Sequence, residues 1–289
     1  MSFVWRTKLL LAIVLVMMAA SCSTSETSST EPDGPDAVTS VDSWGTLFEA
    51  AGVTGTFSLR EIGSTNTLVW NADRASEPRR PASTFKILNS LIVLETGVLP
   101  DTETSVPWDG IERNVPEWNQ DHNLRSGIEV SAVWAYQELA RQVGNERMQE
   151  WVTKADYGNT NIAGGIDEFW LRGDLRISPL EQLDFLEAFA TGDLPFDGDV
   201  MDAVADILIR ERGENWTWSH KTGTAIVEDP DLGWLVGITT HEAQTFVFAM
   251  NLDLETSGNL GGQIDPQLRQ DITREILISE GALPESALG

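Results

Sequence analysis

The stretch Pro81-Ala-Ser-Thr-Phe-Lys-Ile-Leu-Asn-Ser-Leu-Ile-Val-Leu-Glu-Thr-Gly97 decides how the rest of this chain is interpreted. Its apolar spacing predicts a helix, and Gly97 is typical of a helix C-terminus. Ser83 and Lys86 are three residues apart at the start of this helix, so their side chains share one face and can approach hydrogen-bonding distance. The sequence therefore presents a hydroxyl and an amine as a candidate catalytic pair.

A serine hydroxyl becomes a strong nucleophile only when an adjacent base removes its proton. The Lys86 amine can act as this base once its pKa falls far below the ordinary value of about 10.4. Burial among the apolar residues around it would favour the neutral amine. A simpler interpretation is that Ser83 only caps the helix, as serine commonly does before an apolar helix. The spacing alone leaves both interpretations open.

The composition excludes some classes of partner. The chain has 289 residues, 41% of them hydrophobic, which is enough for a sizeable core in one large domain or two small ones. Its formal net charge is -26, so the phosphates of nucleic acid or anionic lipid would be repelled. The three histidines, His122, His220 and His241, lack zinc-like spacing, and we expect no metal ion.

The first residues indicate export. Arg6 and Lys8 precede an apolar run from Leu9 to Ala20, which predicts a signal peptide over residues 1–21. The single cysteine, Cys22, follows at a position that resembles a bacterial lipoprotein cleavage site, so we expect either a lipid on Cys22 or simple cleavage nearby. The predicted location is periplasmic, with membrane contact only through such a lipid. Residues 22–42 are rich in Ser, Thr, Glu, Asp and Pro and predict a disordered acidic tether.

The remaining residues, 43–289, predict one α+β domain. Alternating apolar residues indicate two strands, then helices, then three consecutive antiparallel strands, then a closing helix, over residues 55–61, 66–71, 216–223, 233–240, 245–253 and 265–280. Between the two sets of strands we predict helices over 130–144, 145–154, 177–192 and 201–212. This order favours a central antiparallel sheet of five to six strands flanked by helices.

Three other features fall where an enzyme with a Ser-Lys pair could use them. Ser131 opens a predicted helix and could present a second hydroxyl, although a helix cap is its simpler interpretation. Lys221-Thr222-Gly223 ends a predicted strand and could line a cleft with a cation, a hydroxyl and a small residue. Arg269, on the closing helix, could hold a carboxylate through paired hydrogen bonds. Each signal is weak when taken alone.

Taken together, the motifs resemble those of the class D (oxacillinase-type) serine β-lactamases over roughly residues 44–283. The resemblance rests on Ser83-Thr84-Phe85-Lys86, Leu94-Glu95-Thr96-Gly97, Trp108-Asp109-Gly110, Ser131-Ala132-Val133, Tyr157-Gly158-Asn159, Gly164-Gly165-Ile166-Asp167, Phe169-Trp170-Leu171, Lys221-Thr222-Gly223, Gly233-Trp234 and Ser279-Glu280-Gly281. It implies the serine β-lactamase/transpeptidase-like fold and the hydrolysis of penicillins and oxacillin-type antibiotics.

The resemblance implies that Ser83 attacks the lactam carbonyl and that Lys86, as an N-carboxylated lysine, is the general base. It implies no cofactor beyond the CO2 or bicarbonate that carboxylates Lys86. The apolar pocket that keeps the amine neutral would be formed by Val133, Leu171 and Phe85. The indole N–H of Trp170 would hydrogen-bond the carboxylated lysine.

The same resemblance implies roles for the other motif residues. Ser131 would relay a proton to the lactam nitrogen, while Lys221 keeps the local potential positive. The backbone N–H groups of Ser83 and Thr224 would bind the oxyanion. Thr222 and Arg269 would hold the antibiotic's carboxylate. The further predicted substrate contacts are Gly223, Val133, Leu171 and Trp118.

Three other interpretations remain. The chain could be a β-lactam sensor that is acylated and then stalls, although the sequence lacks the multi-span membrane region of such receptors. It could be a penicillin-binding peptidase, but Val133 and Trp170-Leu171 fit a carboxylated lysine better. It could also have kept the fold and lost catalysis, which the full set of motif residues argues against. Val115 and Thr224 depart from common family residues and leave the range of substrates, including carbapenems, undecided.

Overall fold

The computed structural model describes residues 37–228, 230–254, 265 and 267–288. Contacts divide the chain into Met1–Gly34 and Pro35–Gly289, and the description below concerns the second unit. The predicted signal peptide, residues 1–21, and Cys22 lie outside the described residues. Across the part that is described, no helix has the length and apolar character needed to cross a membrane.

A seven-stranded sheet in the order β1-β3-β2-β7-β6-β5-β4 forms the centre of the fold. All neighbouring strands are antiparallel except β1 and β3, which are parallel. The strands are β1 (Ala37–Ser40), β2 (Gly55–Glu61), β3 (Asn66–Trp70), β4 (Ile209–Arg212), β5 (Trp216–Ala225), β6 (Leu232–His241) and β7 (Gln244–Asp253). The α+β class is therefore as predicted, and all five predicted strands are present.

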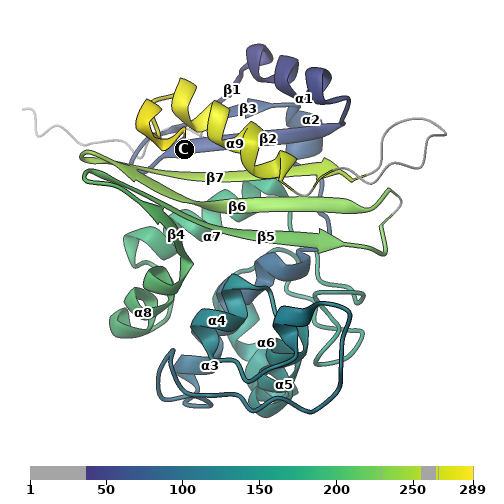
Figure 1. Ribbon diagram of the computed structural model, residues 1–289. Coiled ribbons are helices and arrows are strands. Elements are labelled where there is room, and N and C mark those ends of the chain that lie inside the picture. The colour runs from purple at the N-terminus through teal and green to yellow at the C-terminus, as the bar shows by residue number, and fades with distance from the viewer. Residues whose placement is uncertain (1–36, 229, 255–264, 266, 289) are drawn as a thin grey trace, which may run out of the picture. The chain divides into compact units, whose positions relative to one another are not determined.

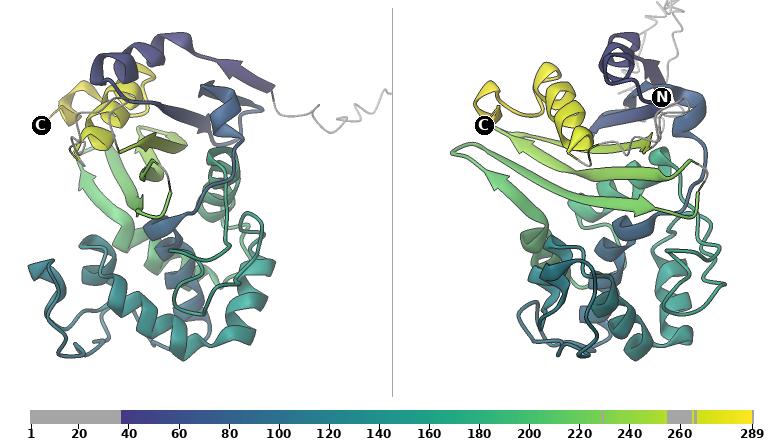
Figure 2. Two further views of the ribbon diagram at one scale, coloured as in Figure 1. Left: turned by 90° about the vertical axis from the view of Figure 1, so that its right-hand side faces the viewer. Right: turned by 45° about the vertical axis from the view of Figure 1, so that its right-hand side comes forward.

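Helices cover both faces of this sheet (Figures 1 and 2). On one face lie α1 and α9, and on the other lie α3 to α8. The helices are α1 (Gly45–Ala51), α2 (Ala72–Ala75), α3 (Lys86–Glu95), α4 (Leu124–Glu129), α5 (Val133–Val143), α6 (Asn145–Lys154), α7 (Pro179–Thr191), α8 (Gly198–Leu208) and α9 (Leu268–Ser279).

The sheet separates two hydrophobic cores. Along β7, Val247 and Ala249 belong to the core under α3 to α8, whereas Phe246 and Phe248 belong to the core under α1 and α9. This alternation follows from the two-residue period of a strand, whose successive side chains point to opposite faces. A continuous apolar strand such as β7 therefore indicates a sheet that is covered on both sides.

The sequence predictions were wrong at the two edge strands, β1 and β4. Residues 37–40 fall in the predicted tether but form β1, which pairs with β3. All four β1 side chains are exposed, so the sequence carried no apolar signal for this strand. The helix predicted over residues 201–212 ends at Leu208, and Ile209–Arg212 form β4 because they pair with β5. Pairing between strands overrode the local helical pattern.

Helix α3 lies at the centre of the larger core. Its first turn is a 3-10 helix, Ala82–Phe85, and the α-helix proper begins at Lys86. Every residue from Lys86 to Val93 is buried. The predicted helix is therefore confirmed, and it holds Ser83 on a tight turn directly before the buried α3.

Candidate active site

A cleft of about 430 Å³ lies at the end of β5. It is lined by Ser83, Trp118, Ser131, Val133, Leu171, Arg172, Thr222, Gly223, Thr224 and Ile226. Four separate segments supply these side chains: the turn before α3, the residues around α4 and α5, the loop between α6 and α7, and strand β5 with the residues that follow it. Every lining residue except Arg172 and Ile226 was a predicted site residue.

Ser83 and Lys86 form a hydrogen-bonded pair at the base of this cleft. The Nζ atom of Lys86 lies 2.8 Å from the Oγ atom of Ser83. Lys86 is completely buried, whereas Ser83 is 9% exposed. Burial lowers the pKa of Lys86 to about 7, because removal from water disfavours the ammonium form. The pair thus has the distance and the neutral amine that activation of a serine requires.

Aromatic side chains supply much of this burial. The Phe85 ring stacks on Trp170, with ring centroids 5.4 Å apart. The Lys86 Nζ atom lies 5.3 Å from the centre of the Tyr136 ring, a contact that the sequence predictions missed. The Nε1 atom of Trp170 is buried and has no hydrogen-bond partner among the residues that the structure describes. A buried donor without an acceptor is costly, so this indole N–H is suited to an added hydrogen-bond acceptor.

Lys221 is a second buried lysine, on strand β5. Its Nζ atom lies 3.1 Å from the carbonyl oxygen of Thr222 and 3.3 Å from the Thr222 Oγ1 atom. Burial lowers the pKa of Lys221 well below its ordinary value, and the charge of Lys86 lowers it further. Two amines therefore lie close to the cleft, and the charge of Lys86 disfavours protonation of Lys221.

Ser131 adopts an unusual backbone conformation between α4 and α5. Its φ is 58°, in the left-handed region that residues with a side chain rarely occupy. The residue that caps α5 is Ala132, and no side chain caps this helix. The simpler interpretation of Ser131 as a cap is therefore wrong, and its side chain lines the cleft instead. Backbone strain of this kind is concentrated at functional sites.

Arg269 lies behind the cleft rather than in its lining. It comes from α9, is 5% exposed, and donates from Nη1 to the carbonyl oxygen of Gly223 at 2.6 Å. The same nitrogen lies 3.3 Å from the Thr224 Oγ1 atom. Burial lowers the pKa of Arg269 to about 10, which still leaves it charged at neutral pH. The structure thus joins Arg269 to the β5 residues of the cleft, and its contact with substrate stays a prediction.

The sequence predictions missed Arg172 and Ile226. Both are largely exposed, and an exposed arginine or a single exposed isoleucine carries no signal for a site. Their positions offered a hint, because Arg172 directly follows Leu171 and Ile226 comes two residues after Thr224. Only the folded chain brings the two segments to one cleft.

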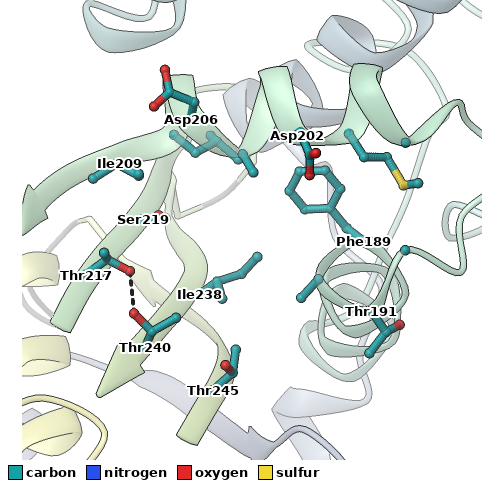
Figure 3. A pocket seen from close by; sticks show the side chains of 16 residues that line it. Phe189, Thr191, Asp202, Asp206, Ile209, Thr217, Ser219, Ile238, Thr240 and Thr245 are labelled. Atoms are coloured by element: carbon teal, nitrogen blue, oxygen red, sulfur yellow. Dashed lines mark hydrogen bonds between the residues drawn. The ribbon is translucent and has the colours of Figure 1, made fainter. Parts of the chain in front are cut away.

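A second cavity, of about 670 Å³, lies between α7, α8 and strands β4 to β7 (Figure 3). Its described lining contains hydroxyls but no lysine, arginine or histidine. Two of the hydroxyls, Thr217 Oγ1 and Thr240 Oγ1, hydrogen-bond to each other at 2.7 Å. The lining also contains the carboxylates of Asp202 and Asp206, but it has no hydroxyl paired with a buried amine as Ser83 is with Lys86, and we assign the chemistry to the smaller cleft.

The described residues contain no cluster of three or more His, Cys, Asp or Glu side chains that could hold a metal ion. His220 is buried on β5, with its ring centre 4.7 Å from that of Trp218. Burial lowers the pKa of His220 to about 3, so the ring is neutral. We interpret His220 as a packing residue of the sheet.

Comparisons with known proteins identify relatives of this chain. The model of the penicillin-binding protein transpeptidase domain matches residues 48–277. The probable β-lactamase YbxI of Bacillus subtilis (strain 168) is 45% identical over 199 residues, covering 69% of this chain and 74% of that protein. The β-lactamase OXA-10 of Pseudomonas aeruginosa is 38% identical over 249 residues, covering 85% and 91%. The solved class D β-lactamase YbXI from Nostoc superposes with a TM-score of 0.78 at 39% identity, covering 83% and 99%.

Proposed function

This chain belongs to the class D β-lactamases, and we propose that it hydrolyses penicillins and oxacillin-type antibiotics through an acyl-enzyme on Ser83. One observation carries the assignment of the residues: a completely buried lysine amine lies 2.8 Å from a serine hydroxyl that lines the cleft. The buried amine is neutral in a large fraction of molecules near pH 7. This supports a role for Lys86 as the catalytic base rather than as one partner of an ion pair.

Acylation uses groups that meet in the cleft. The Ser83 oxygen forms a bond to the lactam carbonyl carbon, and the ring C–N bond then breaks. The Ser131 hydroxyl, which lines the same cleft, gives its proton to the leaving nitrogen and is reprotonated with the proton that the base took from Ser83. Backbone N–H groups of Ser83 and Thr224 bind the developing oxyanion. Water then attacks the ester carbonyl, releases the opened antibiotic and returns the proton to Ser83.

We propose that Lys86 works as an N-carboxylated lysine. Only a neutral amine adds CO2, and the lowered pKa of Lys86 supports this reaction. The unpartnered Nε1 of Trp170 fits a hydrogen bond to the new carboxylate, and the Val133 and Leu171 side chains of the cleft exclude water from it. When present, the carboxylate supplies the base that accepts the proton of Ser83 and later that of the hydrolytic water.

The antibiotic's ring carboxylate would be held at the β5 side of the cleft. The Thr222 hydroxyl lines the cleft, and Arg269 remains charged directly behind Gly223 and Thr224. Lys221, which contacts Thr222, adds positive potential when it is protonated. Trp118 contributes an apolar wall, with its Nε1 hydrogen-bonded to the carbonyl oxygen of Val130 at 2.9 Å.

We also propose that the protein is exported and acts in the periplasm, with a lipid on Cys22 as its membrane anchor. The support is the sequence pattern of residues 1–22. Labelling cells with a radioactive fatty acid tests the anchor. Label on the wild type and none on Cys22→Ser is the expected result, and an unlabelled wild type would reject the anchor.

The central experiment measures turnover. The purified protein is incubated with a fluorescent penicillin, and both the bound label and the opened product are followed over time. Steady release of product with wild type, and neither label nor product with Ser83→Ala, is expected. A label that stays bound for hours would instead identify a β-lactam sensor, and release only from cell-wall peptides would identify a peptidase. An exposed serine variant, Ser76→Ala, is the matched control.

A further inference from the structure

Arg172 differs from every other residue in the lining of the active-site cleft. Of the described residues that line it, Arg172 alone has a charged side chain. The protein as a whole carries a formal net charge of -26, which repels anionic substrates at long range. A cation in the wall of the cleft therefore marks a position where local attraction opposes that repulsion.

The guanidinium of Arg172 is available to a ligand. Its Nε lies 3.8 Å from the Glu168 Oε2 atom, which is beyond hydrogen-bond distance, and the Arg172 side chain is 65% exposed. Arg141, on α5, shows the contrast, with Nη1 only 2.6 Å from the Asp167 carboxylate. The donors of Arg172 thus face water, and a substrate carboxylate could accept two of them.

The backbone that carries Arg172 is fixed even though its head group is exposed. The Arg172 N–H donates to the carbonyl oxygen of Glu168 at 2.8 Å, and the N–H of Gly173 donates to the same oxygen at 3.0 Å. The neighbouring Trp170 is completely buried against Phe85. A long, flexible side chain therefore starts from a rigid point in the wall of the cleft.

Arg172 also comes from a different segment of the chain than the groups proposed to hold the ring carboxylate. Those groups belong to β5 and to Arg269 behind it, whereas Arg172 belongs to the loop between α6 and α7. The cleft also contains two large apolar side chains, Trp118 and the 62% exposed Ile226. An apolar wall beside a single cation suits an acyl side chain that combines an aromatic ring with a carboxylate.

We propose that Arg172 forms a subsite for a second carboxylate, on the acyl side chain of the substrate, so that the enzyme favours β-lactams with an anionic aryl side chain. This inference rests on the proposed hydrolysis at Ser83. Carbenicillin and benzylpenicillin provide the test, because they differ by one carboxylate on the carbon next to the phenyl ring. The measured quantity is the ratio of kcat/KM for carbenicillin to kcat/KM for benzylpenicillin.

The variants are Arg172→Gln, Arg172→Lys and a matched control, Arg212→Gln. Arg212 is 64% exposed, has a comparably long ion pair of 3.9 Å to Asp206, and lies on β4 outside the cleft lining, so its removal changes the net charge equally. We expect the ratio to fall about threefold in Arg172→Gln, the size of an exposed ion pair. It should stay unchanged in Arg212→Gln and be largely kept in Arg172→Lys.

Salt provides an independent measurement. Raising NaCl from about 0.05 M to about 0.5 M should bring the wild-type ratio toward that of Arg172→Gln and leave the variant less affected. An unchanged ratio in Arg172→Gln, or an equal fall in Arg212→Gln, would refute the subsite. If no variant hydrolyses benzylpenicillin, the proposed function fails, which is a distinguishable result.

Discussion

The amine of Lys86 donates a hydrogen bond to the Ser83 hydroxyl at 2.8 Å, and it does so from a completely buried position. An isolated ammonium at such a position is disfavoured, and burial accordingly lowers the pKa of Lys86 to about 7. The activity of the site therefore depends on this pair and on the residues that surround it.

The pH dependence of hydrolysis should follow the protonation of Lys86. Because the folded-state pKa is about 7, the ammonium predominates below that pH and cannot take up CO2. Without added bicarbonate, we expect kcat to fall about tenfold for each pH unit below about 6. Added bicarbonate should restore part of the rate. A flat profile down to pH 5, with the fold intact by circular dichroism, would contradict this role of Lys86.

Removing the Lys86 amine should stabilise the fold even though it abolishes activity. The pKa of Lys86 is lowered on folding from 10.5 to about 7, so the unfolded chain binds this proton more tightly. Between these two values the free energy of unfolding therefore rises with pH, and at pH 7 the charged group still carries a penalty. In CO2-free buffer at pH 7, Lys86→Met should be inactive and more stable by about 2 kcal/mol in urea unfolding. A less stable Lys86→Met variant would show that the amine stabilises the fold.

Trp170→Phe should raise the need for bicarbonate. The change removes the unpartnered Nε1 donor and keeps an aromatic ring against Phe85. A hydrogen bond to a charged group is worth about 1.5 kcal/mol or more, so the bicarbonate concentration for half-maximal activity should rise about tenfold. The matched control is Trp218→Phe, since Trp218 is also buried with an unpartnered Nε1 but belongs to the other core. Equal effects of the two changes would argue against a specific bond.

Ser131→Ala should reduce kcat/KM by about 100-fold with little change in thermal stability. Alanine keeps a Cβ at the strained φ of 58° and removes only the hydroxyl that lines the cleft. Because no helix cap is lost at this position, the melting temperature should change by no more than about 2 °C. A large loss of stability with normal turnover would reassign Ser131 to a structural role.

Gly158→Ala should destabilise the domain by more than about 3 kcal/mol. Gly158 has a φ of 54°, and a methyl group there would overlap the carbonyl oxygen of Arg176. Gly52→Ala separates the two effects, because Gly52 has a φ of 69° with open space around it, and it should cost only about 1 kcal/mol. Urea unfolding measures both. Similar losses would mean that the contact with Arg176 relaxes.

Local patterns predicted much of this protein. The strand patterns of β5 to β7, the apolar α3 and the cap of α7 are all visible within short windows. At the start of α7 the Ser178 hydroxyl accepts from the N–H of Glu181, and the Glu181 carboxylate accepts from the N–H of Ser178. These features depend on neighbours in the chain, so the sequence records them directly.

Long-range contacts decided the rest. Strand β1 carries only exposed side chains, β4 follows directly from a helix, and both exist because a partner strand is available. Arg172 reached the cleft, and Tyr136 reached Lys86, only when distant segments packed together. The sequence by itself determined which residues could carry the chemistry. The tertiary structure decided their protonation and their accessibility, because both depend on burial by residues that are remote in the chain.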